Sequence, residues 1–89
     1  MRKRRGRGQG AHPIAVLATN VRSLRHALGV SQEELAARCG LHRTYVGSVE
    51  RGERNVTLRT VEALASVLGV SVPELLTPRR SDAELKSTD

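Results

Sequence analysis

Apolar residues recur along the middle of the chain at intervals of three and four residues, which is the spacing of one face of a helix. No segment alternates apolar and polar residues as a half-buried strand does. The pattern predicts helices over residues 17–28, 32–39, 42–51, 58–68 and 72–76. It therefore indicates an all-α fold, a compact five-helix bundle.

Capping residues and glycines mark the ends of these helices. Ser31 precedes the second helix with Glu34 three residues on, which is the spacing of a capping box. Ser71 and Glu74 repeat this spacing before the fifth helix. Only the short linker of residues 39–42 separates the second helix from the third, so the two form a central helix-turn-helix.

The apolar face of each helix predicts the core. In the first helix this face comprises Leu17, Val21, Leu24 and Leu28. In the fourth helix it comprises Leu58, Val61, Leu64, Ala65 and Leu68. Cys39 lies on the apolar face of the second helix, so we expect it to be a small buried core residue and not a nucleophile or a metal ligand.

The opposite side of the third helix carries polar residues suited to a ligand. With Val46 and Val49 facing inward, one continuous outward face is predicted to hold Arg43, Thr44, Gly47, Ser48 and Arg51. A helix exposed only for solubility usually carries pairs of Glu and Lys instead. This face suits the major groove of DNA, where Arg43 can bond a guanine and Thr44 can contact a thymine methyl. The alternative is a solvated helix face without a partner.

The stretch from Leu24 to Leu76 resembles the Cro/cI-type (XRE-like) helix-turn-helix family of bacterial and phage regulators. The matching segments, in the family's order and spacing, are LGVSQEELAAR, GLHRTYV, ERGERN and LASVLGVS. RTY followed by ERGERN is most similar to the controller proteins of restriction–modification systems, which are small dimers. The resemblance implies a sequence-specific transcriptional regulator that binds a palindromic double-stranded DNA operator as a homodimer, with helix 42–51 in the major groove.

The resemblance also implies roles for individual residues. Base readout belongs to Arg43, Thr44, Gly47 and Ser48. Contacts with the DNA backbone belong to Gln32, His42, Tyr45, Arg51, Arg54 and Asn55. Arg25 and Glu50 match a structural ion pair. The dimer interface belongs to Val72, Leu75 and Leu76. Because Leu75 and Leu76 are adjacent, one can close the core while the other faces outward.

The net charge of +6, from 15 Lys and Arg against 9 Asp and Glu, is unevenly distributed. Residues 1–13 form a basic, glycine-rich arm whose cations are Arg2, Lys3, Arg4, Arg5 and Arg7. Residues 14–77 form the DNA-binding domain with nearly balanced charge, and residues 78–89 form a polar, flexible tail. The arm has almost no apolar residue to bury, so we expect it to be disordered alone and to anchor phosphates nonspecifically. Insertion into the minor groove and a purely solubilising role are the other interpretations.

Composition excludes several other classes of protein. One cysteine rules out a disulfide framework or a multi-cysteine zinc site, so no metal is expected. No cofactor is expected either. The length does not suit an enzyme with a deep cleft, and no apolar run approaches the roughly 18 residues of a membrane span. We expect no enzymatic activity, no membrane contact, no small-molecule ligand, and a place in the bacterial cytoplasm, associated with the nucleoid when bound. The alternatives are an antitoxin-type or other protein-interaction module, and a nonspecific nucleic-acid binder that acts through the arm.

Overall fold

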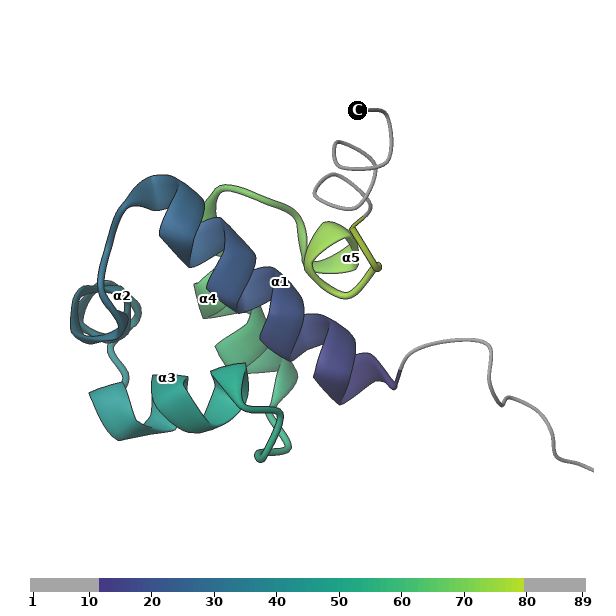
Figure 1. The fold of residues 1–89 in the computed structure, drawn as a ribbon, viewed down its shortest axis with the longest axis horizontal. Helices are drawn as coiled ribbons and strands as arrows, with labels where there is room; N and C mark the ends of the chain where they lie inside the picture. Colours follow the sequence, from purple (N-terminus) through teal and green to yellow (C-terminus); the bar gives the residue numbers. More distant parts are fainter. Residues whose placement is uncertain (1–11, 80–89) are drawn as a thin grey trace, which may run out of the picture.

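The computed structural model describes residues 12–79 and folds them into helices without a strand, which confirms the all-α prediction (Figure 1). The helices are α1 (Pro13–Leu28), α2 (Gln32–Cys39), α3 (Arg43–Glu50), α4 (Leu58–Leu68) and α5 (Val72–Leu75). The predicted arm cations and most of the predicted tail lie outside the described residues: Arg2, Lys3, Arg4, Arg5, Arg7 and residues 80–89.

The first helix begins at Pro13, earlier than the apolar spacing from Leu17 predicts. His12 caps it, because its Nδ1 accepts a hydrogen bond from the Ile14 amide at 3.1 Å. Pro13 fits the first turn, where the missing amide hydrogen is not needed. These two residues together fix the start of α1.

The longest described helix, α1, packs against three of the other four helices. Figure 1 shows it running diagonally across the molecule, with α3 below it, α4 behind it and α5 beside it. It contacts α3, α4 and α5, while α2 contacts α3 and α4. Since α3 lies along the lower edge of this view, no other described helix covers its outer side.

A glycine makes the turn between α2 and α3. Gly40 has a φ of 72°, a left-handed conformation that costs a residue with a Cβ atom extra free energy. This conformation allows the amide of Leu41 to bond back to the carbonyl of Ala36 at 2.8 Å. Only three residues, Gly40, Leu41 and His42, thus connect the end of α2 to the start of α3.

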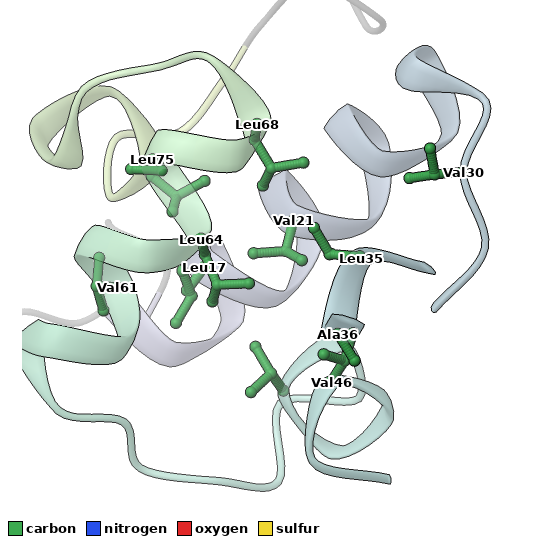
Figure 2. Close-up of a cluster of buried hydrophobic side chains, with 12 residues drawn as sticks. Leu17, Val21, Val30, Leu35, Ala36, Val46, Val61, Leu64, Leu68 and Leu75 are labelled. Atoms are coloured by element: carbon green, nitrogen blue, oxygen red, sulfur yellow. The ribbon is translucent and has the colours of Figure 1, made fainter. Parts of the chain in front are cut away.

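All five helices contribute buried side chains to one core (Figure 2). The fully buried large side chains include Leu17, Val21, Leu35, Val46, Leu64 and Leu75. Burial of each such side chain stabilises the fold by about 1.5–3 kcal/mol. Because α3 presents Val46 and Val49 to this core, its opposite edge is fixed relative to the rest of the domain.

Two leucines that were predicted to face the core do not do so. Leu28 is 46% exposed in the last turn of α1, and Leu58 is 73% exposed in the first turn of α4. Helical spacing predicts which face of a helix is apolar, but not how far along the helix its neighbours extend. Both residues lie at helix ends, beyond the buried cluster.

The short helix α5 is attached to α1 by a buried amide. The Nδ2 of Asn20 donates to the carbonyl oxygens of Leu75 at 2.8 Å and Thr77 at 2.9 Å. Asn20 is only 2% exposed, so these bonds satisfy an amide that is out of reach of water. The predicted capping box is present at the other end of α5, between Ser71 and Glu74.

Candidate nucleic-acid interface

Arg43 and Thr44 lie in the first turn of α3, and both side chains are exposed as predicted. Neither forms a hydrogen bond or an ion pair through its side chain with any residue between 12 and 79. His42, which precedes them at the N-cap, is exposed and makes no side-chain capping bond. The amino end of α3 therefore presents donors and a methyl group to the open side of the molecule.

The prediction that Ser48 faces outward is wrong. The residue is only 6% exposed, and its hydroxyl donates to the carbonyl of Tyr45 at 2.8 Å. The same hydroxyl accepts a bond from the Nε of Arg54 at 3.0 Å. Position on the helix was predicted correctly, but the loop after α3 folds back and covers it. Ser48 is therefore not available to read a base.

Gly47 is also buried, although it lies on the predicted side of α3, because two side chains cover it. A Cβ atom at this position would lie 3.2 Å from Nη1 of Arg51 and 3.5 Å from Oε1 of Gln32. The glycine thus leaves room for two side chains that cross over α3 at this point. Its contribution is space for Gln32 and Arg51, and not contact with a base.

Arg54 is held against α3 by two contacts. Besides the bond to Ser48, its guanidinium lies over the ring of Tyr45, 4.8 Å from the centroid. This cation–π contact and the Nε bond fix the plane of the guanidinium, while Arg54 remains exposed overall. Tyr45 is itself half-buried against the core, so it links the core to this exposed cation.

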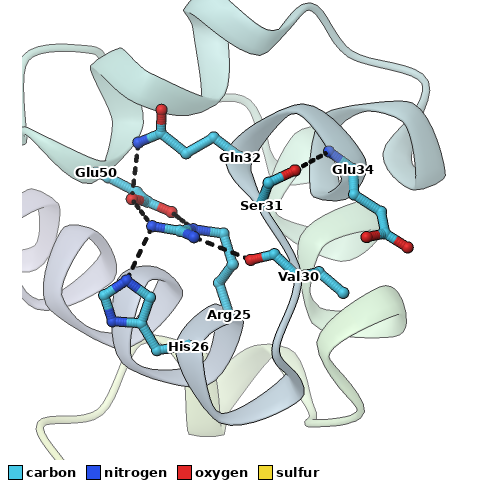
Figure 3. A network of polar contacts seen from close by, with 7 residues as sticks. All are labelled: Arg25, His26, Val30, Ser31, Gln32, Glu34 and Glu50. Carbon is cyan, nitrogen blue, oxygen red and sulfur yellow. Dashed lines mark hydrogen bonds and ion pairs between the residues drawn. The ribbon is translucent and has the colours of Figure 1, made fainter.

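A buried ion pair joins α1 to the end of α3 (Figure 3). The Nε and Nη2 of Arg25 donate to the two carboxylate oxygens of Glu50 at 2.6 and 3.0 Å. Nη1 of Arg25 donates to the carbonyl of Val30 at 3.0 Å, and Nε2 of Gln32 donates to Oε1 of Glu50 at 3.0 Å. The predicted pair of Arg25 and Glu50 is confirmed, and Glu50 also orients Gln32 at the start of α2.

The environment of Glu50 keeps it ionised. Burial alone favours the neutral acid and raises its pKa, but the hydrogen bonds from Arg25 and Gln32 and the charge of Arg25 lower it further than burial raises it. The net result is a pKa below the ordinary value of 4.5. The bond to Glu50 likewise raises the pKa of Arg25.

Stability should therefore fall in acid. Because the pKa of Glu50 is lower in the folded than in the unfolded chain, the ionised pair stabilises the fold above pH 4.5. This stabilisation is lost as the pH falls through the lowered pKa. We expect the free energy of unfolding, from urea titrations at several pH values, to decline below pH 4.5. A carboxyl NMR titration in which Glu50 protonates above its ordinary pKa would contradict the assignment.

The remaining residues predicted to contact the DNA backbone are Arg51 and Asn55. They follow α3, and both are exposed. Nε of Arg51 lies 3.1 Å from a carboxylate oxygen of Glu53, in an exposed ion pair. Asn55 lies further along the same loop. Of the predicted site residues, the structure thus gathers Gln32, His42, Arg43, Thr44, Tyr45, Arg51, Arg54 and Asn55 around α3 and its loop.

Sequence reasoning missed the part that α1 contributes to this side of the molecule. A cavity of about 530 Å³ lies between α1 and the loop, and Arg22, Thr19 and His12 line it together with Arg51 and Arg54. Arg22 lies three residues before Arg25 on α1, and its side chain is exposed. The sequence offered no signal that separates Arg22 from Arg25, three positions on along the same side of α1, because only the fold places the loop beside Arg22.

The chain matches the Helix-turn-helix family model over residues 21–75. The chain belongs to the XRE-like helix-turn-helix family. This helix-turn-helix chain is 63% identical over 62 residues to the control protein C.SmaI of Serratia marcescens, covering 70% of the chain and 74% of the relative. Its α2 and α3 are the two helices after which the family is named.

Solved structures give the same result. The restriction–modification controller protein C.AhdI from Aeromonas hydrophila is 47% identical, with a TM-score of 0.67 over 70% of this helix-turn-helix chain and 94% of that one. The biofilm regulator SinR, solved in complex with DNA, is 32% identical, with a TM-score of 0.66 over 68% and 98% of the two chains.

Other chemistry finds little support in the described part of this helix-turn-helix chain. Between residues 12 and 79 no three His, Cys, Asp or Glu side chains gather closely enough to hold a metal ion. Cys39 is half-buried against the core, and burial raises the pKa of its thiol. None of the helices described combines the length and the apolar character needed to cross a bilayer.

Proposed function

We propose that this chain is a sequence-specific double-stranded DNA-binding transcriptional regulator that inserts α3 into the major groove. The observation that carries the proposal is the amino end of α3, where Arg43 and Thr44 are exposed and unpaired on an edge that no described helix covers. Arginine bonds guanine bidentately, and a threonine methyl packs on the methyl of thymine. The similar regulator SinR was solved in complex with DNA, which supports DNA as the partner.

The distribution of charge supports this orientation. Residues 14–76 hold seven Arg and six Glu, so bulk charge contributes little to their attraction to DNA. Three of the acids are paired with arginines, in Arg25–Glu50, Arg38–Glu34 and Arg51–Glu53. Arg43 and the guanidinium of Arg54 stay exposed on the side of α3 and its loop. The domain thus meets DNA with a few placed cations.

Selection of bound sequences from a random pool of duplex DNA tests this function. We expect enrichment of a palindrome, with half-sites about 34 Å apart, one helical turn. Failure to enrich any sequence, with equal binding to all duplexes, would favour the nonspecific binder that acts through its arm. Absence of binding to duplex DNA would leave the protein-interaction module as the better interpretation.

A homodimer is the oligomeric state that a palindromic operator requires. Leu75 is completely buried in the core, so the prediction that it belongs to the dimer interface is wrong. Val72 and Leu76 are half-buried at the surface of α5. Leu76 shares an apolar hollow with Leu58 and Val56, so we propose this patch as the contact between subunits.

Replacing Leu76 with glutamate should reduce the mass in solution from dimer to monomer. A charge in an apolar contact must be desolvated without a partner, which opposes association. Sedimentation equilibrium measures the mass, and circular dichroism checks that the helices remain. Leu58→Glu, at a residue 73% exposed, should have the same effect without touching the core. Leu28→Glu is the matched control, since Leu28 is an exposed leucine outside the hollow. A dimer of unchanged mass for both patch variants would exclude this interface.

The similarity to control proteins narrows the proposal. We propose that the chain acts as a restriction–modification controller, because it is 63% identical to C.SmaI and carries RTY and ERGERN in α3 and its loop. The basic residues of the arm would then add nonspecific phosphate contacts, and the protein would act in the bacterial cytoplasm on the nucleoid. Neither an enzymatic step nor a small-molecule effector is needed for this function.

A further inference from the structure

A cavity lies between α1 and the loop after α3, beside the cations of that loop. Its volume is about 530 Å³, and α1 forms one wall through Ala18, Thr19 and Arg22. The loop forms the other wall through Arg51, Arg54 and Asn55. The loop packs closely on α1, since a Cβ atom at Gly52 would lie 3.9 Å from that of Ala18. The cavity is therefore bounded by two elements that pack against each other.

The charges around this cavity leave it electropositive. Glu50 is bound by Arg25 and Gln32, and Glu53 is paired with Arg51, so both acids in its lining are already neutralised. Arg22 has no hydrogen bond or ion pair within residues 12–79. Arg54 uses Nε to bond Ser48, which leaves the outer nitrogens of its guanidinium for a further acceptor. An anion placed here would meet two positive side chains that no acid between residues 12 and 79 neutralises.

The position of the cavity indicates which anion. It begins where α3 ends, because Glu50 and Arg51 line it. An α-helix inserted in the major groove is flanked by the two phosphate chains that border the groove, so surfaces beside the inserted helix face phosphates. We propose that this cavity receives a phosphate group of the DNA backbone, and that Arg22 is the cation through which α1 joins the interface. The inference rests on the proposed function and extends it to a helix outside the helix-turn-helix.

Arg22 also has an alternative, purely structural role. Its charge favours the ionised form of Glu50, together with the larger effects of Arg25 and Gln32. A residue with that role alone would affect thermal stability when it is replaced, but it would not change how DNA affinity depends on salt. The two roles are therefore separated by measuring both quantities on the same variant.

The experiment compares wild type, Arg22→Gln and Arg38→Gln on the selected operator across a series of salt concentrations. Each phosphate contact contributes about 0.9 to the slope of log affinity against log salt, so Arg22→Gln should flatten the slope by about 1.8 for a dimer. Its melting temperature should change little. Arg38→Gln is the control, since Arg38 is an exposed arginine paired with Glu34 on α2 and away from the cavity. It should keep the wild-type slope.

A second measurement identifies the phosphate. Neutral methylphosphonates are placed one at a time along the operator, and the contacted position is the one that weakens the wild type but leaves Arg22→Gln unchanged. The inference is overturned if Arg22→Gln keeps the wild-type salt slope, or if Arg22→Gln and Arg38→Gln flatten the slope equally. Either result leaves the proposed function intact. If the wild type itself binds no operator in preference to random duplex, the proposed function fails and this inference fails with it.

Discussion

Replacing Glu50 with alanine is expected to remove a large part of the domain's free energy of unfolding. The substitution leaves the guanidinium of Arg25 buried without its carboxylate, since the side chains of the two residues are only 11% and 3% exposed. Breaking a buried ion pair from one side costs about 3–5 kcal/mol. The whole stability of a domain of this size is about 3–10 kcal/mol, so the loss is a large part of the total. Urea denaturation followed by circular dichroism measures it.

The control for this prediction is Glu34→Ala. Its ion pair with Arg38 has the same 2.6 Å separation but lies at the surface, with both side chains about half exposed. Exposed pairs contribute about 0–1 kcal/mol, so this variant should remain folded. Equal stabilities for the two variants would mean that Arg25 finds another partner and that the pair does not hold α1 to α3.

Replacing Arg43 with alanine should weaken binding to the operator by about 1–3 kcal/mol for each half-site. The side chain is exposed at the amino end of α3 and makes no contact within the described residues that a truncation could disturb. The lost free energy should be accompanied by lost preference at one base position in each half-site, because a bidentate contact with guanine is removed. Fluorescence anisotropy with operators substituted at single positions measures both effects.

Stability and base preference separate this prediction from general charge effects. Arg43→Ala should unfold at the same urea concentration as the wild type, and Arg38→Ala should retain the full base preference. Uniform weakening on every duplex, with the pattern of base preference intact, would show that Arg43 contacts only phosphate.

Much of the fold could be predicted from local signals. Ser31 and Ser71 each accept the predicted bond from the amide three positions on, because capping is local. The full capping box is confirmed only at Ser71, since the Glu34 carboxylate pairs with Arg38 instead. Leu28 and Leu58 were assigned to the core incorrectly, since exposure at a helix end depends on what lies beyond that end. Of the adjacent pair, Leu75 is buried in the core and Leu76 is half-buried at the surface. The spacing predicts that one faces inward, but only the packing of α5 decides that it is Leu75.

The candidate site was less predictable for the same physical reason. Arg43 and Thr44 were identified because a single helix decides which way they face. Ser48 is on the predicted side of α3, yet Arg54, six residues later, covers it. Arg22 was missed because its place in the cavity depends on a loop that begins almost thirty residues further on. Helical spacing carries no information about such contacts between distant segments.

The attachment of both ends of the domain to α1 has a mechanical consequence. Arg25 fastens this helix to α3, and Asn20, about 7.5 Å away along the axis, fastens it to the carbonyls that end α5. In the proposed dimer, the single helix α1 thus connects the surface that reads bases to the surface that joins the subunits. One extra base pair between half-sites would shift one of them by about 3.4 Å and rotate it by about 35°. Because both attachments lie on one continuous helix, the described residues offer no hinge between them. Such a dimer would discriminate between operators by the spacing of their half-sites as strictly as by their bases.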